Sequence, residues 1–434
     1  MTAIPTLIVL AGGASSRMWP IREKSLLRFG PEPLLVAQLK RYAALGFSDA
    51  VIVANPENAD DITALATYVT GMRVRVVVQT EPKGMGDAIL AAEPELDPGQ
   101  PIYINQIHDV VNDSIHESLL EAHAREPGVA FVAGCEREEY FPGGYLVVDE
   151  AGRITGIVEK PGADNRPSNL VNIVIHLYPS GRALFEALRA EYARELTSDD
   201  HYERAMDALM KTMAFKVARY RGPWAALKFP WHVLDVMNAF LGQIKGQRVD
   251  ETAYIAPTAV LAGDVIIGPG AKIFPGAAVV GPAYIGAGVI VGNNALVRQS
   301  MVLDRSDVGF TTEVARSYVA EHCAMHACRV LDSVFAPHVN FSAGCTTANL
   351  RIDHGHVSSA IKGNKLDTGR DKFGAVIGEG AFLSVDVMTM PGVKIGAGAQ
   401  VGPGMHVHHD LKDGVRAYVK QEIVIVESDE GKTL

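Results

Sequence analysis

One short stretch of this sequence gathers residues that could bind phosphate. "LAGGASSRMWPIREKS" begins at Leu10, puts Gly12 and Gly13 directly after an apolar run and follows them with Arg17 and Lys24. Backbone N–H groups of such a glycine turn can cradle phosphate oxygens, and the two basic side chains would add positive charge at the same place. The stretch therefore predicts a phosphate-binding loop.

A second stretch, "HCAMHAC", holds two histidines four residues apart beside two cysteines, from His322 to Cys328. On a helix this spacing suits zinc, but the stretch has neither an HExxH pattern nor a helical context. The other interpretations are a histidine that only fills space and a histidine that acts as a general base, which this side chain can do near neutral pH. The choice for His326 depends on the fold around it.

The bulk composition limits the possible partners. The chain has 434 residues, 48% hydrophobic and 21% charged, with a net charge of −10, which suits a globular protein of two or three domains. An acidic chain without a long basic run argues against nucleic acid as a principal partner. No apolar stretch approaches the ~20 residues that a membrane-spanning helix needs. Four cysteines without a CxxC pair indicate reduced thiols, so we expect a cytoplasmic protein.

Residues 1–245 alternate short apolar runs of strand length with helical patterns. The strand-like runs are rich in β-branched residues: "TLIVLAG", "DAVIVAN", "RVRVVVQ" and "PIYINQI". Fully apolar strands alternating with helices indicate a mostly parallel sheet that is covered on both faces. We therefore predict a Rossmann-like α/β domain over residues 1–245.

Residues 246–434 follow a different pattern, with an aliphatic residue at every sixth position. The first run in phase is Ile255, Leu261, Ile267, Ile273, Val279, Ile285, Val291 and Val297. The second is Ile377, Leu383, Thr389, Ile395, Val401 and Val407. Short repeats with one inward aliphatic residue indicate a β-solenoid. Between about residues 303 and 376 the frame is broken, and we expect loops there.

The first half resembles sugar-1-phosphate nucleotidylyltransferases, whose signature LAGGxxxRM…K it carries. The resemblance implies nucleotidyl transfer from an NTP to a sugar 1-phosphate, with Arg17 and Lys24 as catalytic residues and Mg²⁺ held by Asp109. The implied nucleotide-binding residues are Leu10, Ala11, Gly12, Gly13, Gln79, Gly84, Met85 and Asp109. The implied sugar-binding residues are Gly144, Glu159, Lys160 and Asn172.

One departure from that family concerns the metal. Relatives carry an aspartate in a W-x-D segment, where this chain has Ala226, and His232 stands where they have a later acid. Asp235 and Asn238 could substitute as ligands, or Lys228 could supply fixed charge instead. Retained activity and a first domain that no longer turns over both remain open.

The second half resembles bifunctional N-acetylglucosamine-1-phosphate uridylyltransferase/glucosamine-1-phosphate acetyltransferases and their archaeal relatives, through "VNFSAGCTTANLRID". The resemblance implies a left-handed parallel β-helix of hexapeptide repeats, a homotrimer, acetyl-CoA as co-substrate and His326 as the catalytic base. The other residues of the implied acetyl-transfer site are Arg316, Arg329, Asn349, Lys372 and Ser384. Arg316 stands alone where relatives have several lysines, and Arg329 replaces a tyrosine.

The residues and the resemblance together predict a sugar-1-phosphate nucleotidylyltransferase followed by a β-helix. The resemblance implies that this β-helix assembles a trimer and acetylates an amino sugar as a second activity. The changes at Arg316 and Arg329 mean that either the acceptor differs or acetyl transfer has been lost. The alternative is an acetyltransferase, or an assembly or regulatory protein, whose first domain binds ligand without turnover. The base and the sugar are not predicted.

Overall fold

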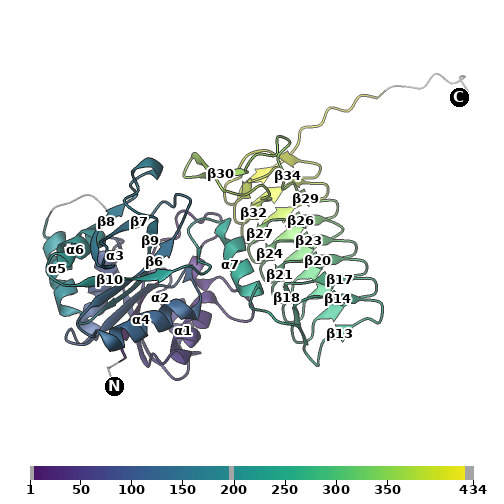
Figure 1. The fold of residues 1–434 in the computed structure, drawn as a ribbon. Coiled ribbons are helices and arrows are strands. Elements are labelled where there is room, and N and C mark those ends of the chain that lie inside the picture. Colours follow the sequence, from purple (N-terminus) through teal and green to yellow (C-terminus); the bar gives the residue numbers. More distant parts are fainter. Residues whose placement is uncertain (1–3, 195–199, 426–434) are drawn as a thin grey trace, which may run out of the picture. The chain divides into compact units, whose positions relative to one another are not determined.

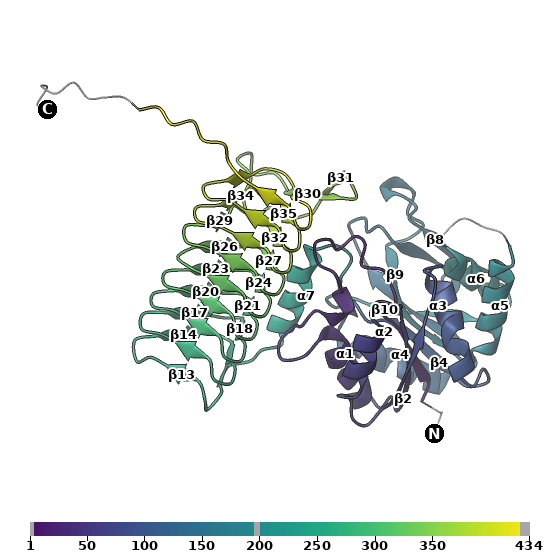
Figure 2. The same ribbon diagram turned by 180° about the vertical axis from the view of Figure 1, so that it is seen from behind.

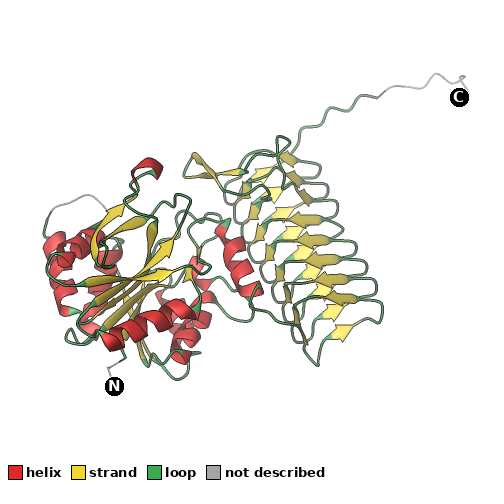
Figure 3. Ribbon diagram, in the orientation of Figure 1, coloured by secondary structure: helices red, strands yellow, loops and turns green. Residues whose placement is uncertain are grey.

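The computed structural model describes residues 4–194 and 200–425 and contains two compact units, Met1–Gln243 and Ile244–Leu434 (Figure 1). Among the described residues, every helix lies in the first unit, and the second consists of strands and loops (Figure 3). None of these helices is both long and apolar enough to cross a membrane.

The first unit is built on a sheet in the order β10-β6-β9-β4-β1-β2-β3, in which only β9 runs antiparallel to its neighbours β4 and β6. The hairpin β7–β8 adjoins β9. The strands are β1 (Thr6–Leu10), β2 (Asp49–Ala54), β3 (Arg73–Val78), β4 (Ile102–Gln106), β6 (Ala130–Glu136), β7 (Gly144–Val148), β8 (Ile154–Glu159), β9 (Leu170–Tyr178) and β10 (Phe215–Tyr220). The predicted mostly parallel α/β architecture is confirmed.

Two hydrophobic cores cover the two faces of this sheet because successive side chains of a strand point to opposite faces. On β1, Leu7 and Val9 join one core, and Ile8 and Leu10 join the other. The first core takes residues from α1 (Leu34–Ala44), α2 (Ala59–Ala66) and α4 (Asp113–Arg125). The second takes residues from α3 (Met85–Ala92), α5 (Arg182–Tyr192) and α6 (His201–Met210).

Short elements complete the first unit near the ends of the parallel strands. A two-stranded antiparallel sheet joins β5 (Asp109–Val110) to β11 (Ala225–Ala226). The 3-10 helix η1 (Lys24–Leu26) follows the glycine loop, and α7 (His232–Leu241) ends the unit. Two further 3-10 helices are η2 (Glu93–Glu95) and η3 (Ala163–Asn165).

The second unit is a left-handed parallel β-helix made of three parallel sheets (Figure 2). The first sheet contains β12 (Gln247–Val249), β15 (Val265–Ile267), β18 (Ala283–Ile285), β21 (Met301–Val302), β24 (Tyr318–Val319), β27 (Val334–Phe335), β32 (Val376–Ile377) and β35 (Lys394–Ile395). The second contains β13 (Tyr254–Ile255), β16 (Lys272–Ile273), β19 (Ile290–Val291), β22 (Asp307–Val308), β25 (Ala324–Met325), β28 (Asn340–Phe341), β33 (Phe382–Leu383), β36 (Gln400–Val401) and β38 (Arg416–Ala417). The third contains β14 (Val260–Ala262), β17 (Ala278–Val280), β20 (Leu296–Arg298), β23 (Glu313–Ala315), β26 (Arg329–Leu331), β29 (Thr346–Thr347), β34 (Met388–Thr389) and β37 (His406–Val407).

The six-residue phase predicts the interior of the coils correctly. Ile273, Val291 and Leu383 are fully buried in one continuous core, and Thr389 takes the same kind of position. The first two residues in phase, Ile255 and Leu261, pack against this core but stay partly exposed. They belong to the first coil, which has a neighbouring coil on one side only.

The break in the frame has a different cause from the expected loops. Ile255 pairs with Ile273, eighteen residues on, but Met325 pairs with Phe341, only sixteen residues on. The coils therefore continue up to β29 but lose residues at their corners. Four corners are each one residue shorter than the six-residue frame, and each contains a left-handed residue other than glycine: Gln299, Arg316, Ala327 and Asp332. The insertion that interrupts the coils comes after β29 and contains the hairpin of β30 (Ser358–Ile361) and β31 (Asn364–Asp367).

Candidate active site

The glycine loop is held against the end of β2. Ala11 N–H donates to the carbonyl of Val53 (2.9 Å), and the Asn58 side-chain amide donates to the carbonyl of Ala11 (3.1 Å). A Cβ atom on Gly12 would lie 2.9 Å from the carbonyl oxygen of Ala54, so only glycine fits there. A Cβ atom on Gly13 would meet open space, which leaves its backbone accessible to a ligand.

Lys24 is the central cation of the first unit. Its Nζ lies 3.2 Å from Nε2 of His108. Burial lowers the pKa of Lys24 to about 8, with the charges of Arg17 and Lys228 acting in the same direction and Asp109 against them. Burial and the charges of Lys24, Lys228 and Arg17 hold the pKa of His108 well below its usual range. His108 is therefore neutral and accepts the hydrogen bond from the Lys24 ammonium.

Asp109 stands directly across a short β ladder from Ala226. Asp109 pairs with Ala226 in the β5–β11 ladder, and Nε1 of Trp224 donates to Asp109 Oδ1 at 3.0 Å. Burial raises the pKa of Asp109, while Lys228, the Trp224 hydrogen bond and Lys24 lower it. Ala226, which the sequence analysis aligned with an aspartate of related proteins, is therefore the residue that faces Asp109.

The residues around Asp109 do not fit a metal ion held by the protein. Nowhere in residues 4–194 and 200–425 are three His, Cys, Asp or Glu side chains grouped so that they could hold a metal ion. One oxygen of Asp109 already accepts from Trp224, the charges of Lys24 and Lys228 act on this carboxylate, and Arg17 interacts with both lysines. A divalent cation without phosphates would be repelled there.

The predicted base-binding residues lie together at the start of α3. Gln79 Nε2 donates to the carbonyl of Gly84 (3.0 Å) and to Oδ2 of Asp87 (2.8 Å). Gly84 has φ of +93°, a backbone conformation that glycine adopts readily, and α3 begins at Met85. Because both partners of Nε2 are acceptors, the amide oxygen is the group that Gln79 could offer to a base.

The predicted sugar-binding residues come from β8, β7 and β9. Gly144 pairs with Glu159, and Lys160 Nζ lies 3.0 Å from Glu159 Oε1. On β9, Asn172 Oδ1 lies 2.9 Å from His176 Nε2, whose ring also bonds the hydroxyl of Tyr202.

Sequence reasoning missed the partners of Asn172. Burial lowers the pKa of His176 to about 3, so the ring is neutral. Nε2 faces the amide oxygen of Asn172, which can only accept, so in this arrangement Nε2 carries the proton and fixes the orientation of the Asn172 amide. A histidine four positions after an asparagine on a strand shares its face, which is a weak sequence signal.

In the second unit, His326 is exposed at the corner between β25 and β26. Gly309 lies under its ring, since a Cβ atom on Gly309 would come within 3.3 Å of His326 Nδ1. Arg329 is exposed on β26, and Ser384 follows β33 at the same corner. The neighbouring thiols of Cys323 and Cys328 are buried in the coil, and burial raises the pKa of each to about 12.

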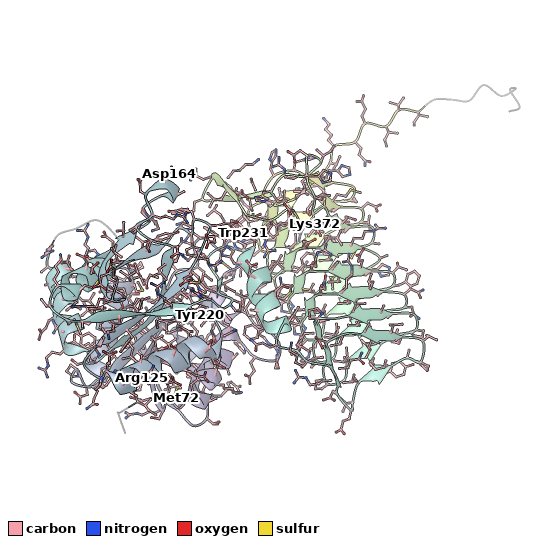
Figure 4. The ribbon with its side chains drawn as sticks, viewed as in Figure 1. Met72, Arg125, Asp164, Tyr220, Trp231 and Lys372 are labelled. Carbon is pink, nitrogen blue, oxygen red and sulfur yellow. The ribbon has the colours of Figure 1, made fainter. Side chains whose placement is uncertain are left out.

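Arg316 and Asn349 belong to a different corner, between the third and first sheets. Arg316 makes a two-pronged ion pair with Asp332 (both contacts 2.6 Å), and the Asn349 amide donates to the same carboxylate. Lys372, labelled in Figure 4, is exposed where its backbone bridges to Leu350. The structure thus brings Arg316 and Asn349 together, but within one chain it places them at another corner from His326.

Each of the two units matches a known protein family. The nucleotidyl transferase family model matches residues 6–227, and the GMPPB C-terminal domain model matches residues 261–365. A "Bifunctional sugar-1-phosphate nucleotidylyltransferase/acetyltransferase" from Sulfurisphaera tokodaii is 30% identical over 94% of this chain and 98% of its own. The chain belongs to this bifunctional nucleotidylyltransferase/acetyltransferase family.

Further similar proteins match either most of this chain or about half of it. The "Bifunctional protein GlmU" of Methanococcus aeolicus is 28% identical over 96% of this chain and 98% of its own length. A solved structure of UDP-glucose pyrophosphorylase with UDP-glucose aligns with 56% of this chain and all of that chain, at 18% identity and a TM-score of 0.47. The resemblance inferred from the sequence is confirmed.

Proposed function

We propose that the first unit transfers a nucleotidyl group from an NTP to a sugar 1-phosphate and releases pyrophosphate. The observation that carries the proposal is the set of three cations, Arg17, Lys24 and Lys228, which interact with one another while Asp109 interacts with the two lysines. The backbone N–H of Lys24 donates to Ser15 Oγ, two residues after the glycine pair (3.4 Å). Clustered cations without an equal number of acids are costly unless a polyanion neutralises them.

In the proposed reaction, an oxygen of the sugar phosphate attacks the α-phosphorus of the NTP. The bond from that phosphorus to the bridging oxygen breaks, and pyrophosphate leaves with the electron pair. No base is needed because the sugar phosphate oxygen is already ionised. Catalysis by positioning and charge neutralisation suits such a transfer, and Mg²⁺ would enter as part of the nucleotide complex.

The first test is pyrophosphate release over a grid of substrates. The purified protein would be given UTP, dTTP, GTP, CTP or ATP, each with glucose-, N-acetylglucosamine-, glucosamine- or mannose-1-phosphate and Mg²⁺. Release that requires one sugar and one base supports the proposal and identifies both. Nucleotide binding with no release anywhere in the grid would instead support a first unit that binds ligand without turnover.

The pH profile of this reaction should have a limb set by Lys24. Its pKa is lowered to about 8, so the ammonium is present below that pH and is lost as the pH rises through it. We therefore expect kcat/KM, which reports the free enzyme, to fall above pH ~8. Lys24→Arg should abolish this limb, since a guanidinium stays charged. A limb of the same position in Lys24→Arg would assign it to another group.

The position of His326 favours acetyl transfer as a second activity. We propose that this residue accepts the proton of an amine that attacks the thioester of acetyl-CoA, forming an amide and releasing CoA thiol. Its exposed ring over Gly309 is open to a ligand. Because Arg316 and Asn349 lie at another corner, the proposal requires that a second copy bring that corner close. This would be met by a homotrimer.

Replacing His326 by alanine should lower acetyl transfer to glucosamine 1-phosphate by about 10²–10⁴-fold, because the loss of a general base costs that much. The measurement is release of CoA thiol. Pyrophosphate release by the same variant should stay at the wild-type rate. His322→Ala is the matched control, since His322 stacks on His338 at a different corner (ring centroids 4.9 Å apart). Equal losses in both variants would contradict a catalytic role for His326.

A further inference from the structure

Lys228 lies in the candidate site close to Ala226, the position where related proteins carry an aspartate. It comes two residues after Ala226, and its N–H donates to the carbonyl of Ala226 (3.0 Å). The next hydrogen bonds in the chain hold this turn in place, since Nδ1 of His232 accepts from the backbone N–H groups of Lys228 and Phe229 (3.2 and 3.3 Å). The turn is therefore fixed beside Asp109, the register partner of Ala226.

The electrostatic partners of the Lys228 side chain come from both ends of the site. Asp109 and Arg17 belong to the phosphate end, and Glu159 and Lys160 belong to the predicted sugar end. The ammonium also lies 4.2 Å from the ring centroid of Phe141, a position that a cation occupies without an acidic partner. Lys228 thus stands between the two ends, where the α-phosphate and the sugar phosphate would meet.

Resting on the proposed function, we infer that Lys228 is a catalytic residue that replaces a protein-held metal ion. Its ammonium contacts the α-phosphate and neutralises charge that builds up as pyrophosphate leaves. Alanine at position 226 removes a carboxylate that would pair with this lysine and would attract a metal. Mg²⁺ then arrives with the NTP and leaves with pyrophosphate.

Binding of Mn²⁺ to the protein without nucleotide tests this inference apart from turnover. Titration followed by electron paramagnetic resonance should show no binding to the wild-type protein at millimolar Mn²⁺. The double variant Ala226→Asp/Lys228→Ala, which restores a second carboxylate and removes the lysine, should bind Mn²⁺. Binding to the wild-type protein would overturn the inference, whether or not the enzyme turns over.

Turnover supplies the second arm of the test. Lys228→Met removes the charge but keeps the length of the side chain, and we expect kcat to fall by about 10²-fold, with Lys228→Arg retaining most of the rate. The wild-type rate should stop rising once all NTP is in its Mg²⁺ complex. A wild-type rate in Lys228→Met would overturn the inference.

The two proposals fail in distinguishable ways. If no sugar and base give pyrophosphate release in the wild-type protein, the proposed function fails and the Mn²⁺ titrations still decide whether this site takes a metal. Lys211→Ala is the control for loss of a lysine in the same unit, because Lys211 is exposed and pairs with Asp207 one helical turn away. Tryptophan fluorescence, with Trp224 beside the site, checks that each variant folds.

Discussion

Lys24→Ala is expected to lower kcat/KM for pyrophosphate release by about 10²–10³-fold, the usual cost of removing one preorganised charge from a transition state. The backbone N–H of Lys24 donates to Ser15 Oγ beside the glycine pair, and its side chain is fixed by a hydrogen bond to His108. Burial has already removed much of its hydration, so its charge acts on bound phosphate with little screening by water. The loss should appear in kcat as well as in KM, because the negative charge on the leaving pyrophosphate grows during the reaction.

Two comparisons separate this effect from loss of structure. Lys211→Ala should react at the wild-type rate, since the Lys211–Asp207 pair is exposed and contributes little. Lys24→Arg should retain part of the rate because it keeps the charge in another shape. If Lys24→Ala and Lys211→Ala turn over equally fast, the phosphate site is elsewhere and the role of Lys24 is structural.

The sequence predicts the β-helix well because its signal is local. The strands of the regular coils contribute an inward residue at every sixth position, and the six-residue phase finds it without knowledge of the neighbouring coil. The phase is lost after Val297 because some corners become one residue shorter, and the chain turns at these corners through single left-handed residues such as Arg316 and Ala327. Outside glycine, such residues have no strong sequence signature, so the continuation of the coils through β29 could not be predicted.

The candidate sites were predicted with less detail because they depend on long-range contacts. The W-x-D comparison located Ala226, but only the ladder shows that it faces Asp109, more than a hundred residues earlier in the chain. The hydrogen bonds of His108 and Trp224 at this site also join distant segments. In the β-helix, Arg316 and His326 are close in sequence yet occupy different corners, since ten residues cover more than half a coil.

Phe335→Ala is expected to lower the free energy of unfolding of the β-helix by about 3–5 kcal/mol, the cost of a large cavity in a packed core. Phe335 lies on β27, is fully buried and packs edge-on against Phe341 with ring centroids 5.2 Å apart. A coil contacts only its neighbours, so its packing cannot be shared with a distant part of the core. The opening should therefore centre on the coils that contain β24 to β29.

The two units can be followed separately in this experiment. All three tryptophans, Trp19, Trp224 and Trp231, lie in Met1–Gln243, so their fluorescence reports the first unit. Native-state hydrogen exchange locates the loss in the β-helix, at one protein concentration for all variants, because assembly would add to apparent stability. Phe310→Ala is the matched control at a position that is 53% exposed, with an expected change below about 0.5 kcal/mol. Equal destabilisation by Phe335→Ala and Phe310→Ala would mean that the Phe335–Phe341 pair is not a main source of β-helix stability.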